Sequence, residues 1–292
     1  MPRKILIIGG DSQIAGATRA HLRNCNYEVL ATTRRREHIA VDRPFLDLTQ
    51  QVANWPIPGG IDAVCLCAAI ARLADCAKDP TGSAQVNVLA TTTLAERFLA
   101  RGIPVLFLST DKVFDGSRPI VPPDASPCPI SEYGRQKAAA EAALVAHMKH
   151  GEPAAILRLA KIVSPGMALL RQWVFDLSSG KPIRAFHDMM MAPTPVALVA
   201  QAIERLLAEP HPGIFQLTGP QDIAYSEIAQ HLAQKLDVDP ALVEQVSAYS
   251  ANLPVGSTAP NTTLDSSALR ERFGITVPAA WTVIDDLAET CR

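Results

Sequence analysis

The feature that most constrains the fold is a short apolar run near the start of the chain, Lys4–Ile8, which ends at the glycine pair Gly9-Gly10. A run of aliphatic and β-branched residues bounded by glycine is typical of a parallel strand that is buried on both faces. The residues that follow predict a helix from about Gln13 to Arg23. A buried strand that turns through glycines into a helix indicates an α/β sheet with helices on its faces.

The same alternation continues to about residue 163. Further strands are expected over 27–32, 45–47, 63–69, 105–109 and 154–159, and helices over 84–100 and 131–150. This order favours a doubly wound parallel sheet of the Rossmann type. We therefore expect a Rossmann domain that covers residues 1–163.

After about Ser164 the pattern changes. Prolines and methionines gather over 182–195, helices are expected over 196–207 and 226–236, and a short strand over 213–218. No internal repeat and no low-complexity linker separates this part from the first. We expect a smaller lobe over residues 164–292 that packs on the Rossmann domain, with an approximate boundary across which elements interleave.

Composition restricts the class of protein. Hydrophobic residues make up 48% and charged residues 19% of the 292, which is typical of a globular chain and not of a disordered one. The net charge of −2, with no basic run longer than Arg34–Arg36, argues against nucleic-acid binding. No stretch approaches the roughly 20 apolar residues that cross a bilayer. The start of the chain lacks the cleavage pattern of a secretory signal.

The cysteines indicate a reducing compartment. Their spacings contain no CxxC pair, so neither a zinc site nor a redox motif is expected. We expect reduced thiols in a cytoplasmic protein without a metal site. The six positions are Cys25, Cys65, Cys67, Cys76, Cys128 and Cys291.

The turn between the first strand and its helix is the expected place for a nucleotide pyrophosphate. Backbone N–H groups at a helix N-terminus bind phosphate closely only where the residues are small. Those positions are Gly9, Ser12 and Ala15, of which only the first is glycine, so an ordinary strand–turn–helix corner remains an alternative. A dinucleotide bound there would also contact Gln13 and Ile14.

The end of the second strand bears on which dinucleotide would bind. A carboxylate there hydrogen-bonds the ribose hydroxyls of NAD, whereas a cation suits the 2′-phosphate of NADP. Here the strand leads into Arg34 and Arg35, with no acid before Glu37. This favours NADP(H), with NAD(H) possible and a solvated basic loop as the alternative. The adenine and ribose would pass the later strand ends, at Asp47, Leu48, Ala68 and Ala69.

Candidate catalytic residues lie on the helix expected over 131–150. Tyr133 and Lys137 are four residues apart and so share one helix face. A phenol with a pKa near 10 exchanges protons poorly at neutral pH, and a nearby ammonium stabilises its phenolate. Lys137 would also hydrogen-bond the nicotinamide ribose. Such pairs also arise by chance on solvated helix faces, so a second signal is needed.

The second signal is a pair of hydroxyls at the end of the strand over 105–109. Ser109 and Thr110 lie at the carboxyl edge of the sheet, where ligands bind in this architecture. A hydroxyl there can donate to a carbonyl oxygen while Tyr133 supplies the proton. Ordinary turn chemistry is the alternative for these two residues.

Together these segments carry a resemblance. The order Gly9…Ala15, Ser109-Thr-Asp-Lys-Val-Phe-Asp-Gly116, Tyr133-Gly-Arg-Gln-Lys137 and Leu157-Arg-Leu159 resembles the dTDP-4-dehydrorhamnose reductase family of extended short-chain dehydrogenases. Asp188…Ala192-Pro-Thr194 is similar to that family's substrate-side loop, and Pro260–Asp265 to its carboxy-terminal signature. The resemblance covers nearly the whole chain.

The resemblance implies a reaction and its residues. Thr110, Tyr133 and Lys137 would form a catalytic triad that reduces a keto group of a sugar nucleotide, with a hydride from the nicotinamide and a proton from Tyr133. Asn87 would support the cofactor region, or else lie on a helix surface. A homodimer is possible. The expected substrate contacts are Asp111, Val113, Phe114, Lys161 and Pro193.

Departures from the family pattern leave the substrate open. Lys112 replaces an aromatic residue and Lys161 a tryptophan, and both lie near the expected substrate. Two alternatives remain. One is an epimerase or dehydratase that recycles its cofactor, in which Asp111 would be the additional acid. The other is a non-catalytic NADP-binding regulatory subunit, such as the regulatory β subunit of methionine adenosyltransferase.

Overall fold

A computed structural model describes residues 2–291 of the chain. Its centre is a six-stranded sheet in the order β10-β5-β4-β3-β1-β2, in which every neighbouring pair is parallel. This confirms the Rossmann-type fold class. The strands are β1 (Lys4–Ile8), β2 (Glu28–Ala31), β3 (Ala63–Leu66), β4 (Val105–Thr110), β5 (Ala154–Leu159) and β10 (Gly213–Leu217).

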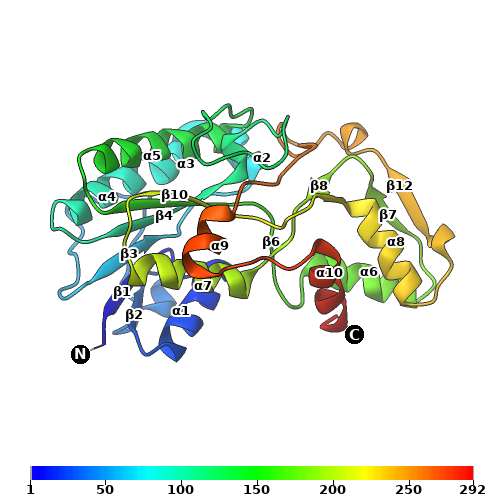
Figure 1. Ribbon diagram of the computed structural model, residues 1–292, viewed down its shortest axis with the longest axis horizontal. Helices are drawn as coiled ribbons and strands as arrows, with labels where there is room; N and C mark the ends of the chain where they lie inside the picture. Colours follow the sequence, from blue (N-terminus) through cyan, green and yellow to red (C-terminus); the bar gives the residue numbers. More distant parts are fainter. Residues whose placement is uncertain (1, 292) are drawn as a thin grey trace.

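Helices cover both faces of this sheet (Figure 1). In β1, Ile5 and Ile7 are buried with residues of α1 (Gln13–Asn24) and α7 (Val196–Ala208). The alternate residues, Leu6 and Ile8, are buried with residues of α4 (Thr91–Leu99) and α5 (Glu132–Lys149). Successive side chains of a strand point to opposite faces, so burial on both faces explains why β1 is apolar throughout.

Two elements differ from the sequence-based expectation. The strand expected over 45–47 is only an isolated parallel bridge between Thr33 and Phe45, because Pro44 has no N–H to donate and Asp47 turns the chain by accepting from the Thr49 N–H at 3.0 Å. The helix expected over 84–100 is present, but it begins earlier and contains a π-helical segment: α3 (Pro80–Ala84), the π-helical segment (Gln85–Ala90) and α4 follow one another without a break. A separate short helix, α2 (Leu73–Lys78), precedes them.

A smaller lobe with its own hydrophobic core follows β5 (Figure 1). It pairs β7 with β12 in parallel and β8 with β11 in antiparallel fashion. Met191, from the methionine cluster, lies in this core. The lobe elements are α6 (Ala168–Ser178), β7 (Ile183–Phe186), β8 (Met190–Met191), β11 (Ile223–Ala224), α8 (Tyr225–Lys235), β12 (Val243–Val246) and α10 (Ala280–Glu289).

The chain crosses between the two parts more than once. A short parallel pair, β6 (Ile162–Val163) with β9 (Thr194–Pro195), lies where it passes between them. It then returns to the Rossmann domain as α7 and β10, and α9 (Ser267–Phe273) also packs there through Leu269. The elements therefore interleave around the boundary expected at residue 163. Within residues 2–291, no helix has the length and apolar character needed to span a membrane.

A buried ion pair links α5 to the sheet. Arg158 on β5 is 1% exposed and donates to both carboxylate oxygens of Glu141, with a shortest N···O distance of 2.8 Å. The same guanidinium donates to the Pro123 carbonyl and to the Gln216 side chain, and lies 4.9 Å from the centre of the Phe114 ring. This one side chain therefore connects α5, β5, β10 and the segment near residue 123.

We expect Arg158→Met to lower the free energy of unfolding by about 3–5 kcal/mol, because it leaves the Glu141 carboxylate buried without a partner. Urea denaturation measures this change. The exposed pair Arg184–Glu244 is the matched control, and Arg184→Met should change the free energy by less than about 1 kcal/mol. Equal effects of the two substitutions would contradict the assignment.

Candidate active site

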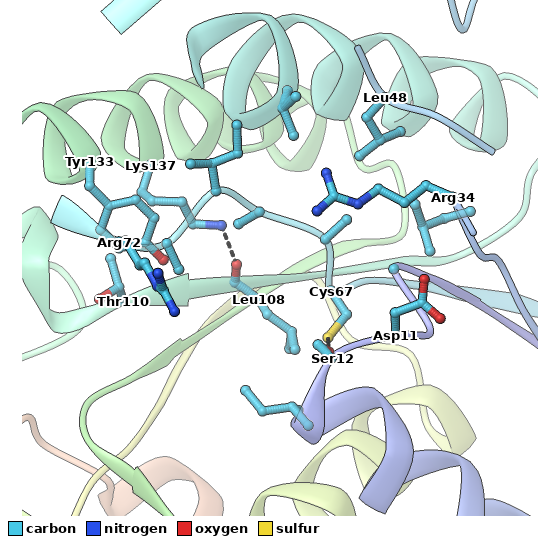
Figure 2. A pocket seen from close by; sticks show the side chains of 18 of the residues that line it. Asp11, Ser12, Arg34, Leu48, Cys67, Arg72, Leu108, Thr110, Tyr133 and Lys137 are labelled. Atoms are coloured by element: carbon cyan, nitrogen blue, oxygen red, sulfur yellow. Dashed lines mark hydrogen bonds between the residues drawn. The ribbon is translucent and has the colours of Figure 1, made fainter. Parts of the chain in front are cut away.

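A cavity of about 660 Å³ lies at the carboxyl ends of the parallel strands. It is lined by Ile8 at the end of β1, Cys67 just after β3, Leu108 near the end of β4 and Leu159 at the end of β5. Its volume lies in the range of small-molecule sites, and its position is where α/β sheets bind ligands. Figure 2 shows the side chains that line it.

One end of the cavity is built from the turn between β1 and α1. Gly9 has a φ of +95°, and a Cβ there would lie 2.6 Å from backbone atoms of Ala68, so only glycine fits. Its N–H donates to the Thr32 hydroxyl at 2.9 Å. Ser12 caps α1, and its side chain accepts from the Ala15 N–H. The N-terminus of α1 thus meets the cavity, as an anion-binding site requires.

The structure brings nearly all of the predicted cofactor residues to this cavity. Gln13 is the exception, because its side chain donates to the Ser164 hydroxyl, at the passage toward the lobe. The predicted residues that line the cavity are Gly9, Ser12, Ile14, Arg34, Arg35, Asp47, Leu48, Ala68, Ala69 and Lys137.

Positive charge faces the cavity at the end of β2. Figure 2 shows Arg34 near Asp11 and Leu48, at the opposite end from Tyr133. Burial would raise the pKa of Asp11, but the Thr33 hydroxyl and the Arg43 charge lower this pKa overall. The carboxylate is therefore already compensated. No ion pair in residues 2–291 joins Arg34 or Arg35 to an acid, although the Arg35 charge also lowers the pKa of Asp11.

The other end carries the three predicted catalytic residues. Thr110 ends β4, and Tyr133 and Lys137 project from the first turns of α5 into the same cavity (Figure 2). A Cβ at Gly134 would lie 2.0 Å from the Lys112 carbonyl oxygen. The glycine after Tyr133 is therefore needed so that α5 can approach the chain just beyond Thr110.

Lys137 is buried, and its hydrogen bond within the described residues goes to a backbone carbonyl. Its ammonium donates to the Leu108 carbonyl at 2.5 Å and lies 3.8 Å from the centre of the Phe107 ring. Burial lowers the pKa of Lys137 to about 7, although the Glu141 charge opposes this shift. The pKa of Tyr133 is raised, first by burial and then by the Asp111 charge. The phenol is therefore protonated at neutral pH, and in the protein alone it is a weaker acid than a free phenol.

The hydroxyls at the end of β4 differ in their partners. Thr110 donates to the Asp111 carboxylate at 3.0 Å, and this carboxylate also pairs with Lys112 at 3.1 Å. The Ser109 hydroxyl is buried, lines the cavity and has no hydrogen-bond partner among the described residues. A buried polar atom without a partner is costly, so Ser109 indicates a polar ligand group in the cavity.

The predicted substrate contacts are placed differently. Val113 and Phe114 pack in a small hydrophobic cluster with Val121 and Leu264, because their apolar side chains turn into the core beneath the strand end. None of the five predicted contacts lines the cavity. Asp111 is engaged as described above and Pro193 is buried, whereas Lys161 is exposed between two residues that do line it.

Asn87 is a buried structural amide, 1% exposed, and not a surface one. It accepts from the Ile70 N–H at 2.8 Å and donates to the Ile70 carbonyl at 2.9 Å and to the Gln136 side chain at 2.8 Å. It therefore fixes the cavity-lining segment near Ile70 against α5. That segment continues to Arg72, a cavity-lining residue that the sequence analysis missed. The only signal was a charge shortly after a strand end.

Burial of Lys137 predicts a pH dependence of stability. Its pKa is about 7 when folded, against an ordinary 10.5, so between these pH values the unfolded chain binds more protons. The free energy of unfolding that this group contributes therefore rises with pH across that window. Relative to Lys137→Met, the wild type should gain on the order of 1 kcal/mol per pH unit. Denaturant unfolding of both proteins from about pH 7 to about pH 10 tests this, and a constant difference would contradict it.

The described residues contain no group of three or more His, Cys, Asp or Glu side chains that could hold a metal ion.

The profile of the family described as RmlD substrate binding domain matches residues 3–291. A similar solved structure is a dTDP-4-dehydrorhamnose reductase from Bacillus anthracis in complex with NADP, with a TM-score of 0.81 and 19% identity. The match covers 98% of this chain and 99% of that one.

Similar curated proteins fall into two classes. The probable low-salt glycan biosynthesis reductase Agl14 of Haloferax volcanii is 30% identical over 82% of this chain and 80% of its own. The dTDP-4-dehydrorhamnose reductase of Sinorhizobium fredii is 26% identical over 94% and 93%. The methionine adenosyltransferase 2 subunit beta of Xenopus laevis is 30% identical over 72% of this chain and 64% of its own. The chain therefore belongs to the RmlD substrate-binding-domain family, which confirms the resemblance seen in its motifs.

Proposed function

We propose that this protein is an NADPH-dependent reductase that acts on a keto group of a sugar nucleotide. One observation carries the proposal. A single cavity has a helix N-terminus and two unpaired arginines at one end, and Tyr133 with Thr110 and Lys137 at the other. The first end suits a phosphorylated dinucleotide and the second suits proton transfer to a carbonyl. The reductases among the relatives support this assignment.

The cavity fits a nicotinamide dinucleotide. The α1 N-terminus would hold the pyrophosphate, and Arg34 with Arg35 would hold a 2′-phosphate. Since these arginines have no carboxylate partner, NADP(H) is preferred and NAD(H) is possible. The unpartnered Ser109 hydroxyl would gain a polar partner from the bound ligand. When bound, the reduced dinucleotide supplies the hydride.

The residues at the catalytic end then handle the proton. Tyr133 holds its proton at neutral pH, as any phenol does, and can donate it to the oxygen of a keto group. Its raised pKa makes the phenol a weaker acid, so the donation needs a group that stabilises the phenolate. The Thr110 hydroxyl can turn from Asp111 to the same oxygen and help to orient it. The phenolate that remains would be stabilised by the ammonium of Lys137, which lies on the same face of α5.

The contacts of Asp111 favour a reductase over a dehydratase. A dehydratase needs an additional acid that can reach the substrate, whereas the Asp111 carboxylate is engaged by Thr110 and Lys112 and does not line the cavity.

The methionine adenosyltransferase subunit among the relatives supports a second candidate, a nucleotide-binding subunit without turnover. Oxidation of NADPH across a panel of keto sugar nucleotides distinguishes the two. Binding of NADPH without any turnover would favour the regulatory subunit.

Tyr133→Phe should lower kcat for the best substrate of that panel by at least about 100-fold, because it removes the proton donor. The dissociation constant for NADPH should change by less than about twofold, since the aromatic ring remains. The control is Tyr249→Phe, at a tyrosine that is 73% exposed in the lobe. Turnover of Tyr133→Phe at the wild-type rate would refute the assignment of Tyr133.

Arg34→Ala and Arg35→Ala should each weaken NADPH binding about tenfold and NADH binding less than twofold, because only NADPH carries the 2′-phosphate. Fluorescence titration with both cofactors measures this. Arg36→Ala is the matched control, because the Arg36 guanidinium lies over the Phe45 ring and does not line the cavity. Equal losses for the two cofactors would defeat the 2′-phosphate assignment.

A further inference from the structure

Arg72 is a charged residue of the cavity to which the proposed mechanism gives no role. It precedes α2, follows the segment that Asn87 fixes through Ile70, and lines the same cavity as Tyr133 and Thr110. In Figure 2 it lies at the end of the pocket that carries these two residues, away from Arg34 and Asp11. A guanidinium at this end faces the part of the site that would hold the substrate. It does not face the part that would hold the adenosine ribose of the dinucleotide.

This guanidinium has no anionic partner within residues 2–291. Near the cavity, by contrast, Arg43 and His38 pair with Asp11, and Lys112 pairs with Asp111. Asp75, one turn further along α2, also lines the cavity, but no ion pair joins it to Arg72. The side chain is also exposed, so it can turn toward a ligand without breaking a contact.

The cavity therefore presents unpaired positive charge at both ends. The 2′-phosphate of a dinucleotide would account for Arg34 and Arg35, but that phosphate lies at the far end from Arg72. An arginine offers a planar set of donors that binds phosphate or carboxylate in a bidentate manner. The group that Arg72 meets must therefore belong to the second ligand of the cavity.

We propose that Arg72 binds an anionic group of the substrate beside the reacting carbonyl, either a phosphate of the nucleotide or a carboxylate on the sugar. This inference rests on the proposed function for the identity of the second ligand. It makes Arg72 a specificity-determining residue, because neutral free sugars would lack the group that it holds.

Calorimetric titration of the NADP⁺-loaded protein tests the proposal without requiring turnover. The probes are the glucose and glucuronate forms of both UDP and dTDP, since each pair differs by one carboxylate. Arg72→Gln should raise the dissociation constant about tenfold. An equal loss for both sugars identifies the nucleotide phosphate as the group, and a loss for the glucuronate form alone identifies a sugar carboxylate. Arg72→Lys, which keeps the charge but not the planar donors, should lose about threefold.

Lys78→Gln is the matched control. Lys78 is an exposed cation at the far end of α2 that does not line the cavity, so its removal should change each constant by less than about twofold. Three results would overturn the proposal: equal effects of Arg72→Gln and Lys78→Gln, weaker NADPH binding in Arg72→Gln, or no binding of any probe to the wild type. Because the readout is binding, failure here is distinct from a failure to oxidise NADPH with keto sugars.

Discussion

The site depends on how closely α5 lies against the end of β4. Two contacts define this approach, the Lys137 ammonium on the Leu108 carbonyl and the backbone of Gly134 against that of Lys112. The first places a charged group inside the sheet–helix interface, where burial lowers its pKa to about 7. The second permits Tyr133 and Thr110 to share one cavity. A side chain at position 134 would push the helix away and separate the phenol from the hydroxyl.

The arrangement of buried charges along α5 explains why the pKa of Lys137 is low. Glu141 is four residues further along α5 and is also buried, so it would be a natural partner for Lys137. Arg158 instead takes both oxygens of this carboxylate, and Lys137 is left with a carbonyl and an aromatic ring. A buried lysine without an acidic partner lowers the stability of the folded protein. Such a cost is expected of a residue that is retained for its chemistry.

The sequence predicted the parts of the fold that depend on local pattern. The bounds of β1 and β5 match the expected ranges, because both strands are buried on both faces and end at clear breaks. Tyr133 and Lys137 were found for the same reason, since helical spacing places them on one face. The strand expected at Phe45 is reduced to a single bridge with Thr33, because Pro44 has no N–H to donate and the chain turns at Asp47.

Placement relative to the cavity was harder to predict, because it depends on which way a side chain turns after an element ends. Val113 and Phe114 follow the catalytic strand but turn into a hydrophobic cluster. Gln13 begins α1 but reaches toward the lobe. Arg72 lies in a segment without regular pattern, and only the buried amide of Asn87 reveals that this segment is fixed beside the site.

The distribution of charge argues that two ligands share the cavity. A dinucleotide bound as proposed would extend along the carboxyl edge of the sheet, and a single set of cations near its 2′-phosphate would be enough to bind it. Arg34 and Arg35 at one end and Arg72 at the other form no ion pair with an acid within residues 2–291. Cations without anionic partners repel one another, and they stabilise the protein only when anions bind them. A second anionic ligand therefore explains the unpaired Arg72 at the catalytic end better than the dinucleotide alone does.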